Sequence, residues 1–423
     1  MIHFSRPIFL DVIAEEFRRI GGRVVLVGGC VRDTLLGLPV AEFDAEVFGL
    51  SSKEALCDVL AKFGPVSEVG KSFGVMKLRY GDTLYDFSLP RTESKVVPGH
   101  RGFSVVTYSD LSFKSAAGRR DFTINAMGYE LETGVLLDPY DGRKDLAAKK
   151  LRHVSEAFSE DSLRVLRAMQ FSGRFDLTLD PETAELCRSI SLDDLPKERI
   201  WDEFKKLFLL SPRPSVGLRV AADLKVGRLF SMIEALSSDD FAKTIEFVDQ
   251  VSPAAVRSEA DLAVILAAFS YYTNAPKDLL SGLVLGNDLI KRSLALRDAA
   301  RGLQPFFLVP HTPVSLDSLV RRLAFQVPIS ELVKLVTGLN PDIANLIESI
   351  AKSIGVYDGP PKPLLTGADL IERGVLPGLR LGHLLDLAFE AYLDGHLHTL
   401  EETLDWLEQE GLIEKNKPLR YNP

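Results

Sequence analysis

Segments with the pattern of β-strands are confined to the first 137 of the 423 residues in this chain. Beyond residue 138, apolar residues recur every three or four positions, as at Leu163, Leu166 and Met169, which is the spacing of an amphipathic helix. The sequence therefore predicts an α+β fold, with a head built on a small mixed β-sheet and then all-helical domains. The strands are expected at 24–27, 43–48, 75–80, 84–89 and 134–137.

A chain of this length, with 46% hydrophobic residues, is long enough to form more than one core. Clusters of Pro and Gly interrupt the helical pattern at 211–214, 308–313 and 358–363. We expect four domains: an α+β head at 1–137, a helical neck at 138–210, a helical body at 211–357 and a helical tail at 358–423.

The formal net charge of -9 argues against a uniformly basic nucleic-acid coat, although phosphate contacts need only a local stripe of Arg and Lys. The three cysteines have the spacing of neither a metal site nor a disulfide framework. The N-terminus fits no secretory signal, and no uncharged apolar run is about 18 residues long. We expect a cytoplasmic protein without membrane partners.

The most informative motif spans residues 28–44. Gly28 and Gly29 follow an apolar strand, so the backbone can approach a phosphate closely there. Glu42 and Asp44 are two residues apart in a strand, so their side chains point the same way. Because Mg²⁺ prefers one or two carboxylates plus substrate phosphates, this order predicts metal-assisted phosphoryl or nucleotidyl transfer.

The motif resembles the head-domain signature of the class II tRNA nucleotidyltransferase and bacterial poly(A) polymerase superfamily, Gly-Gly-x-Val-Arg-Asp-x-Leu-Leu-Gly followed by Asp-x-Asp. The resemblance implies that Glu42 and Asp44 are catalytic and hold Mg²⁺, although the family usually has Asp at the position of Glu42. Glu46 lies on the same face and offers an alternative pair with Asp44. The resemblance also implies that a further set binds the triphosphate, with Asp33 fixing the arginine: Gly28, Gly29 and Arg32.

A second motif spans residues 118–127. Without further context it reads as a loop entering a helix, capped by Asp121 or Thr123. The string also resembles the second motif of the same superfamily, which implies contacts to the ribose and phosphates. Guanidinium groups suit phosphate and a carboxylate suits a ribose hydroxyl, so the expected nucleotide-binding residues are Arg119, Arg120, Asp121 and Asn125.

A third motif spans residues 160–167 and lies in an amphipathic helical pattern. Asp161, Arg164 and Arg167 are spaced by three and are expected to share a helix face. An ordinary surface ion pair would show the same spacing. A carboxylate beside a guanidinium can also pair with an amino group and a ring acceptor, which cytosine and adenine both offer. The stretch resembles the family element that serves as a protein template for the incoming base.

Asp86 lies on a predicted strand, where the family carries a third carboxylate that orients or deprotonates the attacking hydroxyl. Residues 91–103 resemble the basic loop of enzymes that switch from C to A addition. Residues 138–146 resemble the connection from head to neck, and 365–378 resemble the tail that holds the tRNA elbow. Residues 230–360 contain no functional motif.

The predicted function is template-independent addition of C and A to the tRNA 3′ end from CTP and ATP, with Mg²⁺ as cofactor and release of pyrophosphate. Three alternatives stay open: a specialist that adds only A or only CC, a poly(A) polymerase, and a catalytically silent tRNA-binding protein. The oligomeric state is not specified by the sequence.

Overall fold

The computed structural model describes residues 4, 6–69, 74–95, 103–107, 111–229, 237–252, 257–305 and 316–414. The chain divides into two compact units, Met1–Ser231 and Met232–Pro423. Each unit has its own buried apolar side chains.

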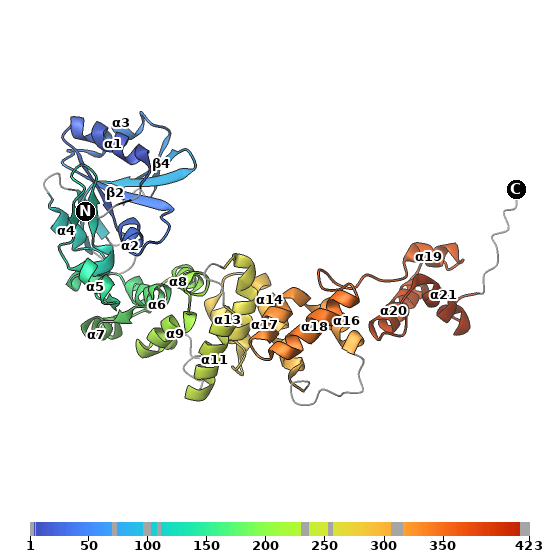
Figure 1. The fold of residues 1–423 in the computed structure, drawn as a ribbon. Helices are drawn as coiled ribbons and strands as arrows, with labels where there is room; N and C mark the ends of the chain where they lie inside the picture. Colours follow the sequence, from blue (N-terminus) through green and yellow to red (C-terminus); the bar gives the residue numbers. More distant parts are fainter. Residues whose placement is uncertain are drawn as a thin grey trace. The chain divides into compact units, whose positions relative to one another are not determined.

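A seven-stranded sheet forms the centre of the head, with the strand order β3-β4-β5-β2-β1-β8-β9 (Figure 1). Strand β2 pairs with β5 in parallel, whereas the other neighbouring pairs in this sheet are antiparallel. The predicted mixed sheet is therefore confirmed. Its strands are β1 (Arg23–Val27), β2 (Glu42–Phe48), β3 (Val66–Val69), β4 (Val75–Tyr80), β5 (Thr83–Ser88), β8 (Gly128–Glu130) and β9 (Leu136–Leu137).

Two helices, α1 (Ile8–Arg19) and α3 (Lys53–Leu60), lie on one side of the sheet (Figure 1). The apolar side chains of α1 recur at three and four and are buried, as expected for a helix with one apolar face. Phe17 of α1 contacts Phe87 of β5, with 6.1 Å between the ring centroids. This face of the sheet is therefore an aromatic and aliphatic core.

The opposite face of the sheet is divided between an apolar end and a charged end. Helix α4 (Phe113–Ala117) packs over the apolar end, which contains Val25, Val27 and Phe48. At the other end of β2, Glu42 and Asp44 are exposed. Since α4 covers only part of this face, the charged end is open to a ligand.

The rest of the first unit is mostly helical, and α6 packs against both α8 and α9. Glycines permit this close packing: a Cβ added at Gly217 would lie 2.7 Å from the Met169 carbonyl oxygen. The elements are α2 (Gly29–Leu35), η1 (Thr123–Asn125), α5 (Gly142–Ala147), η2 (Glu156–Glu160), α6 (Leu163–Phe175), α7 (Pro181–Ser189), α8 (Lys197–Leu210), α9 (Pro214–Asp223) and η3 (Val226–Leu229).

Several short strands were not predicted. They include β3 and β8 in the main sheet and two separate two-stranded ladders, β6 (Arg91–Lys95) with β7 (Phe103–Thr107), and β10 (Lys150–Leu151) with β11 (Thr178–Leu179). The expected strand at 134–137 is shortened to β9. Strands of two to four residues carry too few alternations for period-two patterning to identify them, and the five-residue β6 contains no apolar residue while β7 has two adjacent valines.

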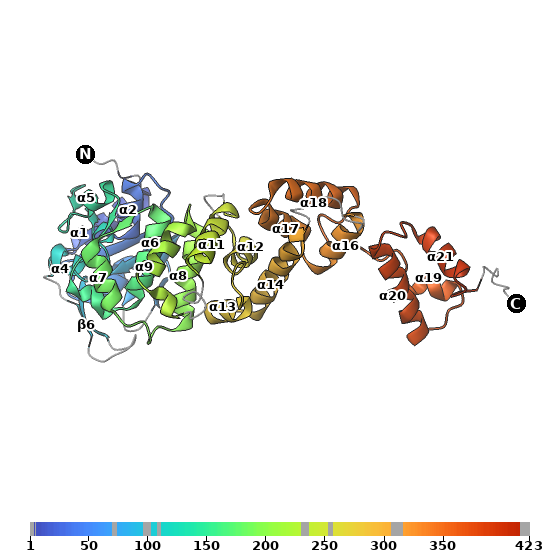
Figure 2. The same ribbon diagram turned by 90° about the horizontal axis from the view of Figure 1, so that it is seen from below.

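In the part of the second unit that the structure describes, all regular elements are helical, as predicted. Helix α12 is buried all round, and it packs against α14 and α17 (Figure 2). The elements before residue 354 are α11 (Ser238–Gln250), η4 (Glu259–Asp261), α12 (Leu262–Phe269), α13 (Pro276–Leu283), α14 (Asn287–Gly302), α16 (Leu316–Gln326), α17 (Ile329–Thr337) and α18 (Pro341–Ser353).

Three helices follow the Pro-rich segment at 358–363: α19 (Gly367–Glu372), α20 (Leu379–Leu393) and α21 (Leu400–Gln409). They share a small apolar core that includes Leu370, Leu384 and Leu407. Reciprocal capping boxes begin α19 and α21. The helices stop at the predicted breaks near 211–214 and 358–363, whereas 308–313 falls outside the described residues. The boundaries of the four domains stay predictions.

None of the helices in the described ranges combines the length and the apolar character needed to cross a membrane.

Candidate active site

A glycine turn connects strand β1 to helix α2. Gly28 caps the helix with φ of 72°, a backbone conformation that favours glycine. A Cβ added at Gly28 would lie 3.0 Å from Nη1 of Arg120. Glycine is therefore needed here both for the turn and because the Arg120 guanidinium lies against it.

Three carboxylates, which we call the carboxylate face, lie on the charged end of the sheet: Glu42, Asp44 and Asp86. Asp44 of β2 is directly opposite Asp86 of β5 in the parallel register. Neighbouring strands are about 4.8 Å apart, so these side chains are close together. The pairing across β2 and β5 thus brings together two residues that the sequence analysis singled out separately.

Asp86 also has a partner on its other side. Lys77 of β4 is opposite Asp86 in the antiparallel register, and its Nζ donates to both carboxylate oxygens, at 2.9 and 2.6 Å. The row Lys77, Asp86, Asp44 therefore crosses three adjacent strands. Lys77 fixes the orientation of the Asp86 carboxylate.

The surroundings of Asp44 raise the pKa of its carboxyl group above the ordinary value. Desolvation by the neighbouring protein is the largest cause, and the charges of Asp86 and Glu42 add to it, while Arg120 and Lys77 oppose it. The side chain nevertheless keeps an open side, because Asp44 is exposed. Carboxylates that repel one another at an open site are suited to bind a cation.

Oxygen ligands on one strand face fit a hard divalent cation such as Mg²⁺. No group of three or more His, Cys, Asp or Glu side chains with metal-binding geometry occurs in the described part of the chain. The site therefore supplies at most a pair of carboxylates at one position. Mg²⁺ commonly takes one or two carboxylates and completes its shell with water and substrate phosphates, so this pair is sufficient.

Glu46 differs from the other two acidic residues of β2. Its side chain is 1% exposed, and Oε1 accepts from Nη2 of Arg119 at 3.0 Å and from Nη2 of Arg120 at 2.7 Å. Both guanidinium groups therefore bind Glu46. The acidic residues of this strand that face solvent are Glu42 and Asp44.

Five side chains form what we call the buried ion network: Asp33, Arg32, Asn125, Asp121 and Arg167. Arg32 is 4% exposed and donates from Nε to Asp33 at 2.8 Å and from Nη1 to Asn125 Oδ1 at 2.6 Å. Asn125 in turn donates from Nδ2 to Asp121 at 3.0 Å. The first and second motifs, distant in the sequence, are therefore joined by direct hydrogen bonds.

The network continues into the third motif. Arg167 of α6 donates from Nε to Oδ2 of Asp121 at 2.7 Å, and its Nη2 lies 2.6 Å from the same oxygen. Burial alone would raise the pKa of Asp121, but Arg167 and the hydrogen bonds from Asn125 and the Phe122 backbone lower it. Asp121 is thus ionised at neutral pH and fastens α6 to the loop that carries the second motif.

Arg32 occupies a different position from the one expected of a triphosphate ligand. Its guanidinium lies over the ring of Phe175, 4.3 Å from the centroid, and is enclosed by the network. Burial lowers the pKa of Arg32, although Asp33 opposes this. The sequence could not reveal this burial, because Phe175 is more than 140 residues away on α6.

The third motif departs from the predicted shared helix face. Helix α6 begins at Leu163, so Asp161 precedes it and accepts from the Leu163 backbone N–H at 3.1 Å. Arg167 pairs with Asp121, whereas Arg164 donates to the carbonyl oxygens of Ala157 and Arg119, both at 2.7 Å. The prediction was wrong about the face because the spacing of three does not show where a helix starts.

Lys77 and the two aromatic residues beside Arg32, Phe171 and Phe175, were missed in the sequence analysis. Lys77 was detectable: a hairpin turn at Gly81 and Asp82 places Lys77 opposite Asp86 by counting outward along both strands. The phenylalanines gave no signal beyond an apolar helix face. The basic-loop prediction concerns residues 91–103, of which 96–102 lie outside the described residues, as do residues 70–73.

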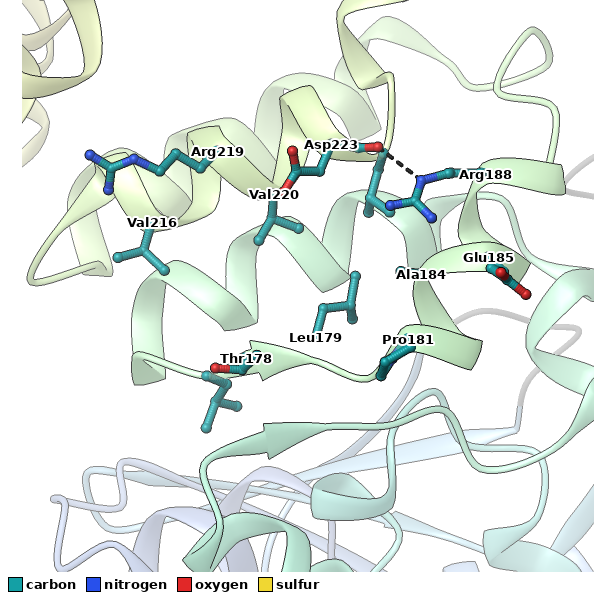
Figure 3. A pocket seen from close by; sticks show the side chains of 12 residues that line it. Thr178, Leu179, Pro181, Ala184, Glu185, Arg188, Val216, Arg219, Val220 and Asp223 are labelled. Atoms are coloured by element: carbon teal, nitrogen blue, oxygen red, sulfur yellow. Dashed lines mark hydrogen bonds between the residues drawn. The ribbon is translucent and has the colours of Figure 1, made fainter. Parts of the chain in front are cut away.

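A separate cavity of about 480 Å³ lies between β11, α7 and α9 (Figure 3). Leu179, Val220 and Pro181 line it, and the Arg188 Nε donates to the Asp223 carbonyl oxygen at 3.0 Å. This bond satisfies a carbonyl group at the C-terminal end of α9, which is a structural role. None of the predicted catalytic or nucleotide-binding residues lines this cavity, so we place the candidate active site at the carboxylate face.

Two family models match the chain. The "Poly A polymerase head domain" matches residues 24–152, and the "Probable RNA and SrmB- binding site of polymerase A" matches residues 176–231. The first match contains the glycine turn, the carboxylate face and Asp121.

Several named relatives are similar to part of the chain. A Multifunctional CCA protein of Leptothrix cholodnii is 41% identical over 220 residues, which are 51% of this chain and 50% of that protein. A Multifunctional CCA protein of Stenotrophomonas maltophilia is 34% identical over 291 residues, which are 67% of this chain and 65% of that protein. The chain spans about half the length of several relatives that it matches.

Solved structures extend the likeness to nearly the whole chain. A CCA-adding enzyme in complex with CTP has a TM-score of 0.72 and 24% identity, covering 96% of each chain. The Thermotoga maritima CCA-adding enzyme complexed with tRNA has a TM-score of 0.69 and 23% identity, covering 96% of this chain and 97% of that one. At this identity the likeness shows the fold. The family models and the relatives show that the chain belongs to the class II tRNA nucleotidyltransferase and bacterial poly(A) polymerase superfamily.

Proposed function

We propose that this protein adds C and A nucleotides to the 3′ end of tRNA without a nucleic-acid template, using CTP and ATP and releasing pyrophosphate. Relatives named Multifunctional CCA protein and CCA-adding enzyme support this proposal, as do similar folds solved with tRNA, CTP and ATP. The observation that carries it is local: on strand β2, exposed Glu42 and Asp44 lie next to Glu46, which binds Arg119 and Arg120.

We assign the cofactor as Mg²⁺ and its protein ligands as Glu42 and Asp44. Their exposure and their common face support the assignment. When bound, Mg²⁺ in such sites lowers the pKa of an attacking hydroxyl and stabilises charge on a leaving pyrophosphate.

The triphosphate would bind between the carboxylate face and the glycine turn. The guanidinium of Arg120 lies against Gly28, so the glycine turn and the Arg119 and Arg120 side chains would contact the phosphates together. Because Arg32 is buried, its role here is to hold Asn125 and the start of α2 through Asp33. Asp121 and Asn125 are buried and bonded to Arg167, to Arg32 and to each other, so their role here is to hold the second motif against α2 and α6.

Asp86 would orient the tRNA 3′ hydroxyl or accept its proton. The position opposite Asp44 brings the carboxylate next to the proposed cation site. Lys77 keeps Asp86 in one orientation, so that the oxygen facing the hydroxyl is defined before substrate arrives.

Base selection is assigned to Asp161 and Arg164. Arg164 is already fixed by two carbonyl oxygens, and Asp161 is fixed at the start of α6. Asp161 supplies an acceptor and Arg164 a donor, which match the amino group and ring nitrogen of cytosine or adenine, whereas uracil and guanine offer the reverse arrangement. Arg167, through Asp121, holds α6 in place for this contact.

The test is a primer-extension assay with Mg²⁺ and three tRNA substrates that end before CCA, after C or after CC. Each receives CTP alone, ATP alone or both. Extension of all three to one complete CCA end is the expected result.

Other outcomes distinguish the alternatives. Addition of A only to the CC-ended tRNA indicates an A-adding specialist, and addition that stops after CC indicates a CC-adding one. Long A tracts on many RNAs indicate a poly(A) polymerase. Absence of pyrophosphate release with all substrates, despite tRNA binding, indicates a silent binding protein and refutes the proposal.

A further inference from the structure

We propose that Glu46 is a positioning residue that holds Arg119 and Arg120 in place for the triphosphate, an inference that rests on the proposed function. Glu46 is not a ligand of the cation in this assignment. It acts through the two arginines, and its effect is on phosphate binding.

The first argument is the division of roles along β2. Glu42, Asp44 and Glu46 alternate onto the same face, yet the first two are exposed and Glu46 is 1% exposed. A carboxylate so deeply buried is costly unless it is paired with positive charge. The two guanidinium groups supply that pairing through a single oxygen, Oε1.

The second argument is the position of Arg120. Its Nη2 is bound to Glu46, while its Nη1 lies 3.0 Å from the position that a Cβ on Gly28 would occupy. The same guanidinium group thus connects Glu46 to the glycine turn. Since Gly28 has no side chain, Nη1 points to the place where the phosphates are proposed to bind.

The third argument is that two buried polar atoms at this contact lack a hydrogen-bond partner. Oε2 of Glu46 and Nε of Arg120 are both buried without a hydrogen-bond partner. Buried polar atoms are usually satisfied in folded proteins, so an incomplete set at a charged position indicates a site that a ligand or its water completes. A phosphate oxygen can accept from the Arg120 Nε, whereas the Glu46 Oε2 needs a donor such as a water molecule.

The chemical expectation follows from when these contacts form. Phosphate groups are bound by arginine both before and during nucleotide transfer, so weakening this grip raises KM more than it lowers kcat. Glu46→Gln keeps the shape and an acceptor oxygen but removes the charge, and Glu46→Asp keeps the charge but shortens the side chain. Glu130→Gln is the matched control, because Glu130 is also buried in this sheet and paired with one arginine, Arg23.

The experiment measures binding of inorganic tripolyphosphate in the presence of Mg²⁺ by calorimetry, together with KM and kcat for CTP and ATP. Glu46→Gln is expected to weaken tripolyphosphate binding and raise both KM values by about tenfold or more, because charge-assisted hydrogen bonds are lost, with kcat changed less. Glu46→Asp recovers part of the loss, and Glu130→Gln leaves binding unchanged.

Tripolyphosphate affinity of folded Glu46→Gln within about twofold of the unmodified protein overturns the proposal. An equal loss in Glu130→Gln overturns it too, because the effect would then be general to the sheet. If Glu46→Gln does not fold, unchanged tripolyphosphate affinity and KM in Glu46→Asp overturn it instead. A protein that adds no nucleotide to tRNA, yet binds tripolyphosphate in a Glu46-dependent way, refutes the proposed function and leaves this inference standing.

Discussion

The carboxylate face and the buried ion network are both made of charged side chains in the first unit, but they are organised in opposite ways. The carboxylate face gathers like charges at an open end of the sheet, and its own neighbours raise the pKa of Asp44. The network alternates opposite charges and amide groups in the interior, and its neighbours lower the pKa of Asp121. The first is incomplete without a ligand, whereas the second is complete in the folded chain. Substitutions in the carboxylate face should therefore lower the rate of nucleotide addition, and substitutions in the buried ion network should lower the free energy of unfolding.

Asp44→Ala is expected to separate activity from stability most clearly. Nucleotide addition should fall by at least about a thousandfold, because a metal ligand is worth several kcal/mol and each 1.4 kcal/mol is tenfold in rate. Single-turnover extension of a CC-ended tRNA measures this. Binding of tRNA and the midpoint of urea unfolding should stay nearly unchanged. Normal turnover by this variant removes the metal assignment.

Asp121→Asn tests the other half of the comparison. We expect a loss of about 3 kcal/mol in the free energy of unfolding, at the lower end for a broken buried ion pair because the Arg167 side chain keeps 32% exposure. Denaturant unfolding measures the loss. Asp176→Asn is the control, since its pairs with Lys149 and Arg213 are at the surface and should be worth about 0–1 kcal/mol.

The same variant gives a pH dependence with a defined sign. Asp121 has a folded-state pKa below the ordinary 3.8, so its stabilising contribution is present above pH 3.8 and is lost as the pH falls through the lowered value. The stability difference between the unmodified protein and Asp121→Asn should shrink over that acidic range. A difference that is constant with pH would show that the carboxylate charge is not the cause.

Arg164 belongs neither to the carboxylate face nor to the buried ion network, and its guanidinium donates to the carbonyl oxygens of Ala157 and Arg119. Arg164→Ala should reduce selectivity for CTP and ATP over UTP and GTP by about tenfold to a hundredfold, the range for losing a bidentate base contact. Competition assays with mixed nucleotides measure the ratio of kcat/KM values. Arg219→Ala, on helix α9 at the separate cavity, is the control and should not change selectivity. Unchanged selectivity in Arg164→Ala contradicts base templating.

Lys77→Met should have a smaller effect, on pH dependence. Burial and the Asp86 and Glu42 charges raise the pKa of Asp44, while Lys77 is one of the groups that oppose the rise. Removing this cation raises the pKa further, so the acidic limb of the pH–rate profile should move to higher pH. An unshifted limb would indicate that Asp44 is not the group that titrates in catalysis.

The smallest effect is expected for Glu42→Asp, which restores the residue usual in the superfamily and should keep activity within about fivefold, because charge and ligand type are preserved. Initial rates at saturating CTP and ATP measure it. Loss of metal-dependent activity in Glu46→Ala, with Glu42→Ala tolerated, would show that the wrong pair of carboxylates has been assigned.

The separation of a sheet-containing head from helical domains was predictable because strand and helix periodicities differ along the chain. The grouping of Glu42, Asp44 and Glu46 on one face also followed from period two. The sequence did not show which of the three is buried. The burial of Glu46 depends on Arg119 and Arg120, which lie on a loop more than 70 residues away. The parallel pairing of β2 with β5, and the contacts of Arg32 with Asn125 and of Arg167 with Asp121, likewise depend on the tertiary fold and have no local pattern.

The contact between Arg167 and Asp121 limits how parts of this protein can be exchanged with those of a relative. Arg167 belongs to α6, whereas Asp121 and Asn125 belong to the loop before β8. A chimera joined between them, at residue 138 for example, would combine a charged group from one parent with a partner chosen for the other. Recombination that keeps residues 119–175 together preserves both partners of the contact. The smallest segment that can be exchanged is therefore defined by this ion pair, and it includes residues from both the sheet-containing head and the helical domain that follows.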